Sequence, residues 1–135
     1  MAEERTIRVL VVDDEVYVVS MLVDLLTESG CVVTTADDGY MALQRVMEQR
    51  PDVIVLDFRM PHLDGIAAAK RLKAHPEFSS VPIVGLTALV DEQTRQRAME
   101  AGIDVLLYKP AEPSEIVRAV RGLAGRTARV AGPTV

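Results

Sequence analysis

The sequence has no tryptophan, and aromatic residues make up only 4% of its 135 positions. Aromatic side chains provide the stacking platforms of proteins that bind single-stranded nucleic acid, so their scarcity argues against that class. The longest apolar runs fall far short of the ~18 residues that span a bilayer. The first ten residues, MAEERTIRVL, lack the cationic and apolar regions of a signal peptide. We therefore expect a cytoplasmic protein that does not enter a membrane.

Cysteine is also nearly absent, because Cys31 is the only one in the sequence. It cannot form an internal disulfide, and we interpret it as a buried thiol in a reducing compartment. Acidic residues outnumber basic ones, so the formal net charge is −5 and the pI is about 5.0. That balance argues against direct contact with a nucleic-acid backbone and suits a protein that gathers a cation.

Hydrophobic residues make up 49% of the chain, which is enough for the core of one domain. Their periodicity predicts strands over 7–12, 32–36, 53–57, 81–87 and 104–108, and helices over 15–29, 40–49, 66–74, 91–101 and 113–123. Five strands that alternate with five helices are typical of an α/β fold, with helices on both faces of a doubly wound parallel sheet. The apolar periodicity is lost near the end. We therefore expect one domain over 1–124 and a flexible tail or linker over 125–135.

Polar and charged side chains collect where the predicted strands end. In chain order they are Asp13, Asp14, Asp57, Thr87 and Lys109. Ligands of a doubly wound sheet bind outside the carboxyl ends of its strands, so these side chains should meet at one edge. The three carboxylates would repel one another without compensation, and a hard divalent cation such as Mg²⁺ would supply it. A hydroxyl and an ammonium group beside them suit a phosphoryl group, with a carboxylate as nucleophile.

Four segments, VLVVDDE, VIVLDFRMPHLDG, VPIVGLTA and YKP, occur in this order within residues 7–124. Together they resemble the receiver domain of the response regulators of two-component signalling. The resemblance implies a flavodoxin-like sheet of strand order 2-1-3-4-5. It also implies phosphoryl transfer from a histidine of a sensor histidine kinase or phosphotransfer protein. The protein would catalyse only its own phosphorylation and slow dephosphorylation, and would not be an enzyme acting on a free substrate.

The same resemblance assigns roles to single residues. Asp57 would be the phosphoacceptor. Asp14 would bind Mg²⁺ directly and Asp13 through water, with Asp57 and the backbone carbonyl of Arg59 completing the protein ligands. Thr87 and Lys109 would hold the phosphoryl oxygens, and the family implies a cis peptide between Lys109 and Pro110.

The sequence departs from the family at its conformational switch. In the family, the residue at Thr87 moves toward the phosphoryl group, and an aromatic residue three before the lysine turns inward. That position holds Leu106 here, which has no ring, and the residue after KP is Ala111 where the family favours a large apolar side chain. An alternative therefore stays open, in which the domain is a constitutive docking or dimerising module with a weakened switch.

Partners follow from the resemblance alone. Members of the family often dimerise through the face formed here by the predicted helix 91–101, strand 104–108 and helix 113–123. A homodimer through this face is one expectation, and the output partner or output domain is not identified by any motif.

Two histidines, His62 and His75, have no second histidine at a ligand spacing, and we interpret both as solvated.

Overall fold

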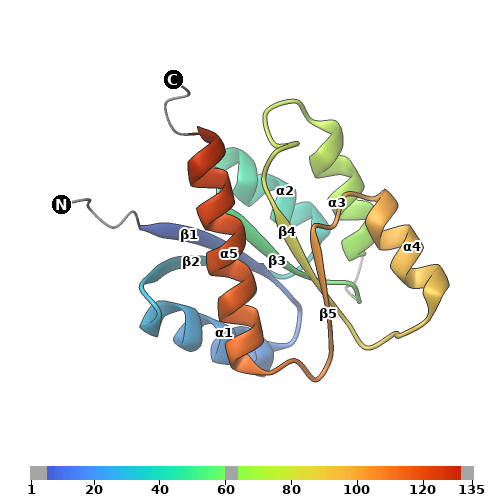
Figure 1. Ribbon diagram of the computed structural model, residues 1–135, viewed down its shortest axis with the longest axis horizontal. Helices are drawn as coiled ribbons and strands as arrows, with labels where there is room; N and C mark the ends of the chain where they lie inside the picture. The colour runs from blue at the N-terminus through green and yellow to red at the C-terminus, as the bar shows by residue number, and fades with distance from the viewer. Residues whose placement is uncertain (1–5, 60–63, 132–135) are drawn as a thin grey trace.

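The computed structural model describes residues 6–59 and 64–131, and their side chains as far as residue 125. Its centre is a single five-stranded sheet in the order β2-β1-β3-β4-β5, and all four strand pairs are parallel (Figure 1). The strands are β1 (Ile7–Val12), β2 (Cys31–Ala36), β3 (Val53–Asp57), β4 (Ile83–Thr87) and β5 (Val105–Tyr108). The predicted flavodoxin-like order is confirmed.

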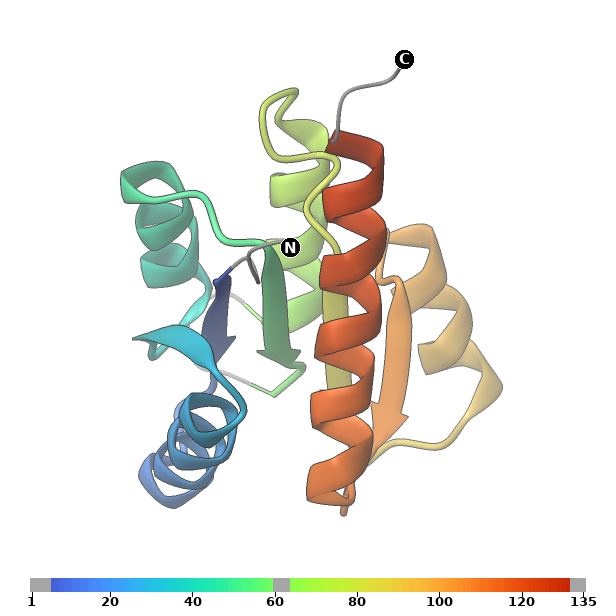
Figure 2. The same cartoon turned by 60° about the vertical axis from the view of Figure 1, so that its left-hand side comes forward.

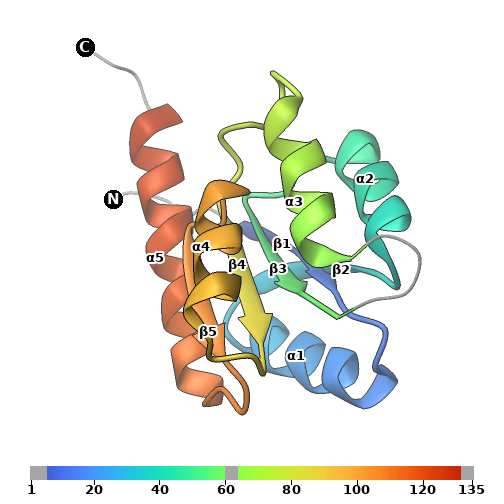
Figure 3. The same ribbon diagram turned by 90° about the vertical axis from the view of Figure 1, so that its right-hand side faces the viewer.

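Five helices of the described chain cover the two faces of the sheet. They are α1 (Val16–Glu28), α2 (Gly39–Glu48), α3 (Gly65–Ala74), α4 (Glu92–Glu100) and α5 (Pro113–Ala131). Helices α1 and α5 lie on one face, and α2, α3 and α4 lie on the other (Figures 1 and 3). Because every strand is parallel to its neighbours, all their carboxyl ends meet at one edge of the sheet.

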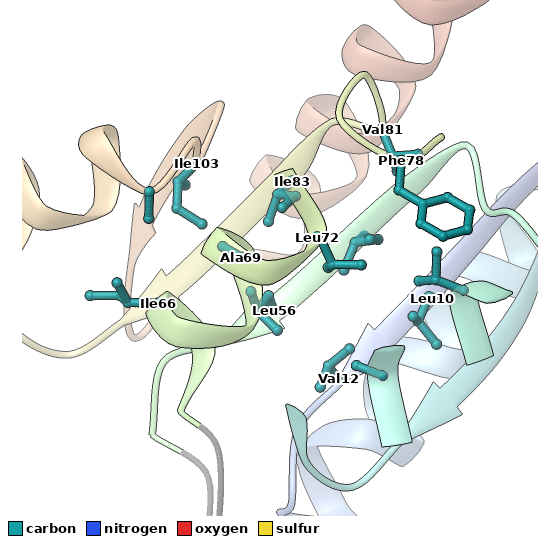
Figure 4. Close-up of a cluster of buried hydrophobic side chains, with 14 of the residues drawn as sticks. Leu10, Val12, Leu56, Ile66, Ala69, Leu72, Phe78, Val81, Ile83 and Ile103 are labelled. Atoms are coloured by element: carbon teal, nitrogen blue, oxygen red, sulfur yellow. The ribbon is translucent and has the colours of Figure 1, made fainter. Parts of the chain in front are cut away.

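The two faces bury separate hydrophobic clusters, which alternate along each strand as expected for period-two side chains. The α2–α3–α4 cluster includes Leu10, Val12, Leu56, Ile66, Ala69, Leu72, Phe78, Val81, Ile83 and Ile103 (Figure 4). The α1–α5 cluster includes Val9, Val11, Leu22, Leu26, Cys31, Val53, Val55, Ile116, Val120 and Leu123. Cys31 is therefore a buried thiol, as predicted, and burial raises its pKa.

Helix α1 only partly presents the stripe that helical spacing indicates, which is Val16, Val19, Val23 and Leu26. Leu26 is fully buried as predicted, but Val16 is 76% exposed and Leu22 is fully buried in its place. The segment VYVVSMLVDLL is apolar on several sides. Periodicity alone could therefore not select the stripe that packs, and the crossing of α1 over β1 and β2 decides it.

Helix α5 continues to Ala131, beyond the end predicted at Leu123. It starts at the carboxyl edge of the sheet and runs back along the strands (Figure 2). Among the residues whose side chains are described, Leu123 and Ala124 are the last of α5 in the α1–α5 cluster. A helix can extend beyond its apolar periodicity because its hydrogen bonds are internal. The division into a domain and a tail at residue 125 stays a prediction.

Strand β4 begins at Ile83, two residues later than predicted. Pro82 has no N–H to give to the sheet, so the regular pairing starts after it. The Ile83 N–H donates to Asp104 Oδ2 at 2.8 Å, and Lys73 Nζ lies 3.4 Å from the same oxygen. Lys73 also donates to the carbonyl of Val81 at 2.9 Å. These contacts tie the end of α3 to the starts of β4 and β5.

Replacing Gly102 by alanine should lower the free energy of unfolding by about 1–3 kcal/mol. Gly102 has a φ of +97°, and an added Cβ would lie 2.6 Å from Lys73 Cγ. Lys73 cannot yield without losing its hydrogen bond to Val81. Urea denaturation would measure the loss.

The matched control is Gly122→Ala in α5, where an added Cβ meets nothing within 4 Å. This change should be neutral or stabilising by up to about 1 kcal/mol, because alanine favours a helix. A Gly102→Ala protein as stable as the Gly122→Ala protein would contradict the strain at residue 102.

Candidate functional site

Three carboxylates gather at the carboxyl edge of the sheet, as the strand ends predicted. Asp57 is the last residue of β3, and Asp13 and Asp14 follow β1. The pairing of β1 with β3 places Val12 opposite Leu56, so the next residues of the two strands are neighbours. Ligand oxygens of the three aspartates all lie within 4.8 Å of one another. Asp13 and Asp57 are buried, and Asp14 is exposed.

Lys109 supplies positive charge to this cluster from the end of β5. Its Nζ lies 2.8 Å from Asp57 Oδ1 and 3.9 Å from Asp13 Oδ2. Its backbone N–H donates to the Thr87 carbonyl at 2.8 Å, and its peptide bond to Pro110 is cis, as expected. Burial opposes the charged form of Lys109, but the hydrogen bond and charge of Asp57 outweigh that effect and raise its pKa.

One ammonium group does not fully compensate the buried acids. Burial raises the pKa of Asp13 to about 6, against the lowering effect of the Glu15 N–H that donates to Asp13 Oδ1 at 2.9 Å. Burial also raises the pKa of Asp57, although Lys109 acts in the opposite direction. Among the described residues, Asp13 Oδ2 has no hydrogen-bond partner. Lys109 Nζ, at 3.9 Å, is too far for a hydrogen bond, so this buried oxygen can still accept a further partner.

An open cavity of about 780 Å³ gives access to the cluster. It is lined by Asp14, Glu15, Asp57, Phe58, Arg59, Asp64, Ala88 and Lys109. The lining combines four acidic side chains with two basic ones. A small polyanion would therefore reach Asp57 only beside a bound cation or the two basic groups.

The start of α3 forms one wall of this cavity. Asp64 caps the helix, since its Oδ1 accepts from the Ala67 N–H at 2.8 Å. The following residue approaches β3 closely, because a Cβ on Gly65 would lie 2.4 Å from the carbonyl oxygen of Asp57. Gly65 also donates its N–H to the Phe58 carbonyl at 3.2 Å. Glycine at this position thus lets α3 hold the backbone of the carboxylate strand.

Of the remaining predicted site residues, Arg59 lines the cavity, whereas Thr87 and Leu106 do not. Thr87 ends β4 but is 1% exposed and does not line the cavity, and its Oγ1 accepts from the Leu89 N–H at 3.0 Å. Arg59 is exposed and lines the cavity, while the role of its carbonyl as a metal ligand stays a prediction. Leu106 packs against the α2–α3–α4 cluster away from the cavity.

Sequence reasoning missed four residues that line the cavity, namely Glu15, Phe58, Asp64 and Ala88. Each is adjacent to a predicted residue or lies in the quoted loop motif, so proximity along the chain was the available signal. His62 lies outside the described residues, and His75 is exposed at the end of α3.

Over the described residues, no helix is both long and apolar enough to cross a bilayer.

A family model and two curated relatives match most of this chain and point to the same family. The family model described as the response regulator receiver domain matches residues 9–121. The transcriptional regulatory protein PrrA of Mycobacterium tuberculosis is 43% identical over 119 residues, covering 88% of this chain and 50% of PrrA. The alkaline phosphatase synthesis transcriptional regulatory protein PhoP of Bacillus subtilis is 38% identical over 127 residues, covering 94% of this chain and 52% of PhoP. The chain thus spans about half the length of the curated relatives it matches.

Solved structures agree in fold. A putative response regulator from Chloroflexus aurantiacus superposes with a TM-score of 0.85 at 35% identity, over 90% of this chain and all of that one. The receiver domain of a sensor histidine kinase from Pseudomonas aeruginosa gives a TM-score of 0.82 at 30% identity, over 90% of this chain and 99% of that one. The latter was solved with a magnesium ion coordinated in its active site cleft.

Proposed function

Because this chain belongs to the family of response regulator receiver domains, we propose that Asp57 accepts a phosphoryl group from a phosphohistidine of a partner kinase or phosphotransfer protein. The observation that carries the proposal is the placement of Asp57. Its carboxylate is 4% exposed, yet it lines an open cavity and contacts Lys109 at 2.8 Å. A nucleophile must reach its substrate and have the developing charge compensated, and this placement meets both needs.

The acidic cluster fits a divalent cation such as Mg²⁺. Asp13 Oδ2 is buried without a hydrogen-bond partner among the described residues, and three carboxylates offer oxygen atoms within 4.8 Å of one another. Hard oxygen ligands of this kind are those that Mg²⁺ prefers. We assign Asp14, Asp57 and the Arg59 carbonyl as direct protein ligands, with Asp13 holding the cation through water. When bound, the cation neutralises the oxygens of the transferring phosphoryl group.

In the transfer, a carboxylate oxygen of Asp57 attacks the phosphorus atom of the phosphohistidine. The new O–P bond forms as the P–N bond breaks, and the bonding electron pair returns to the imidazole nitrogen. Lys109 stabilises the charge on the phosphoryl oxygens. The Thr87 hydroxyl turns away from Leu89 and donates a hydrogen bond to another phosphoryl oxygen.

Hydrolysis by water later releases inorganic phosphate and restores the Asp57 carboxylate. We propose that the protein catalyses only these two steps on itself and is therefore a switch, not an enzyme with a free substrate.

We propose that phosphorylation changes the affinity of the domain for an output partner. Net charge of −5 disfavours direct binding to nucleic acid, so the contact is with protein. A homodimer through the face of α4, β5 and α5 is one such outcome, and exposed Met99 and Tyr108 on this face support it. We also propose a cytoplasmic location, since relatives such as PhoP are named transcriptional regulators. A constitutive docking module is not favoured, because docking alone requires neither a buried acidic cluster nor its lysine.

The direct test exposes the protein to phosphoramidate, whose P–N bond resembles that of phosphohistidine, with and without Mg²⁺. We expect a mass increase of one phosphoryl group on the peptide that contains Asp57, only when Mg²⁺ is present, and its loss on treatment with hydroxylamine. A label on another residue would refute the assignment of Asp57. A label formed equally well in a chelator would refute the metal requirement.

A further inference from the structure

Phe58 connects the acidic cavity with the hydrophobic core. It follows Asp57 directly, lines the cavity, and is only 6% exposed. Its backbone is held on both sides, because its N–H donates to Leu86 O at 3.1 Å and its carbonyl accepts from Gly65 N–H at 3.2 Å. A change at Asp57 is therefore passed to a residue whose side chain lies in the α2–α3–α4 cluster.

The ring of Phe58 occupies the volume that a side chain at position 85 would need. A Cβ built on Gly85 would lie 2.6 Å from Cε1 and 2.9 Å from Cζ of Phe58. The same point lies 3.2 Å from Cγ2 of Ile103. The ring thus fills a slot beside β4 that exists only because residue 85 is glycine, and Ile103, between α4 and β5, borders the same slot.

This slot adjoins the elements that a receiver domain would present to a partner. Gly85 pairs with Leu106 of β5, and Leu106 packs against the same cluster as Phe58. Ile103 donates its N–H to Ala98 O of α4 at 3.1 Å. A displaced ring would therefore act on both α4 and β5. Leu106 has no ring of its own to place in this slot.

We propose that Phe58 is the positioning residue that transmits the state of Asp57 to α4 and β5, with Gly85 providing the slot for its ring. This inference rests on the proposed phosphorylation of Asp57. The aromatic ring of the switch then comes from the residue after the nucleophile instead of from β5. Phe58 follows Asp57 and lines the cavity that would receive the phosphoryl group, so added volume and charge there act on Phe58 directly. Because the core around its ring is close-packed, the displacement of Phe58 is passed to Ile103.

The test uses Mg²⁺ with beryllofluoride, a phosphoryl mimic, at saturation, and follows backbone amide shifts by NMR. In the wild-type protein we expect shifts at Asp57 that extend to Ala98, Ile103 and Leu106. In Phe58→Leu the shift at Asp57 should still report occupancy, and most of the shift at the three remote residues should be lost.

Phe78→Leu is the matched control. Phe78 is a second buried ring of the same cluster, and it lies at the opposite end from Ile103 (Figure 4). Both variants should lose thermal stability, but Phe78→Leu should keep the remote shifts. Equal loss of those shifts in the two variants, or their retention in Phe58→Leu, would overturn the proposal.

Gly85→Ala gives a second test, since its new Cβ must push the Phe58 ring out of the slot. Remote shifts should again be lost. The double variant Phe58→Leu with Gly85→Ala refills the slot with less strain, so it should regain stability without regaining the shifts.

Remote shifts in the double variant would show that the ring is not needed. Wild-type shifts confined to the cavity would overturn the role of Phe58 and leave the phosphorylation chemistry standing. Absence of any wild-type beryllofluoride binding would overturn both.

Discussion

Replacing Asp57 by asparagine will reduce phosphoryl incorporation from phosphoramidate by at least about a thousandfold, because the amide has no anionic oxygen to attack phosphorus. The side chains are nearly equal in size, so the fold should be retained. Removing the carboxylate also leaves Lys109 without its partner at 2.8 Å. The measurement is the initial rate of phosphorylation, followed by intact-protein mass.

Asp64→Asn is the control for this experiment. Asp64 lines the same cavity, but its role in the structure is to cap α3, and asparagine caps a helix equally well. Its phosphorylation rate should therefore stay close to that of the wild-type protein. A hydroxylamine-labile phosphate on the Asp57→Asn protein would refute the assignment of the nucleophile.

Replacing Asp13 by asparagine will have two opposite effects. Affinity for Mg²⁺ should fall at least about tenfold, because a buried carboxylate that would hold the cation through water is lost. The metal-free fold should become more stable by about 1–3 kcal/mol at neutral pH, because a buried charge beside two other carboxylates is removed. Isothermal titration with Mg²⁺ and urea denaturation in a chelator would measure the two effects.

The pH dependence follows from the raised pKa of Asp13, which moves from 3.8 to about 6 on folding. The folded state holds the proton more tightly than the unfolded state. Its contribution to stability is therefore fully present below 3.8 and is lost as pH rises through about 6. The stability advantage of Asp13→Asn should then shrink as the pH falls from neutral toward 4.

Asp24→Asn, at an exposed position of α1, is the control and should change neither property. An Asp13→Asn protein that binds Mg²⁺ as tightly as the wild-type protein would remove Asp13 from the metal site. An unchanged stability in the metal-free state would show that the carboxylate is better compensated than its surroundings indicate.

Local patterns in the sequence were sufficient for most of the fold. The apolar run 53–56 of β3 and the regular alternation of strands with helices predicted the sheet and its helices. Boundaries shifted where a specific contact decided them, as at β4, where Pro82 delays pairing and the Asp104 carboxylate accepts from Ile83. The length of α5 was missed because helical hydrogen bonds are internal, so a helix can extend beyond its apolar periodicity.

The sequence predicted which charged residues form the candidate site. It did not predict how the Thr87 hydroxyl is oriented or that Phe58 lines the cavity. Asp13, Asp57 and Lys109 could be found because parallel strands bring their ends to one edge, and strand-end charges are conspicuous beside apolar runs. Thr87 was found in the same way, yet its hydroxyl accepts from Leu89 and faces no cavity. Phe58 was passed over because an apolar residue after an apolar strand carries no signal of its own.

The sequence by itself thus determined the chemistry, since residue type sets what Asp57, Lys109 and their neighbours can do, and strand order sets where they meet. Only the tertiary structure decided which other side chains contact the site and would respond to a change at Asp57. The space at Gly85 cannot be read from the sequence, and its proposed role depends on the ring of Phe58, which follows β3 and fills that space near Ile103. Contacts between residues far apart in sequence depend on packed volumes, and those exist only once the helices close over the sheet.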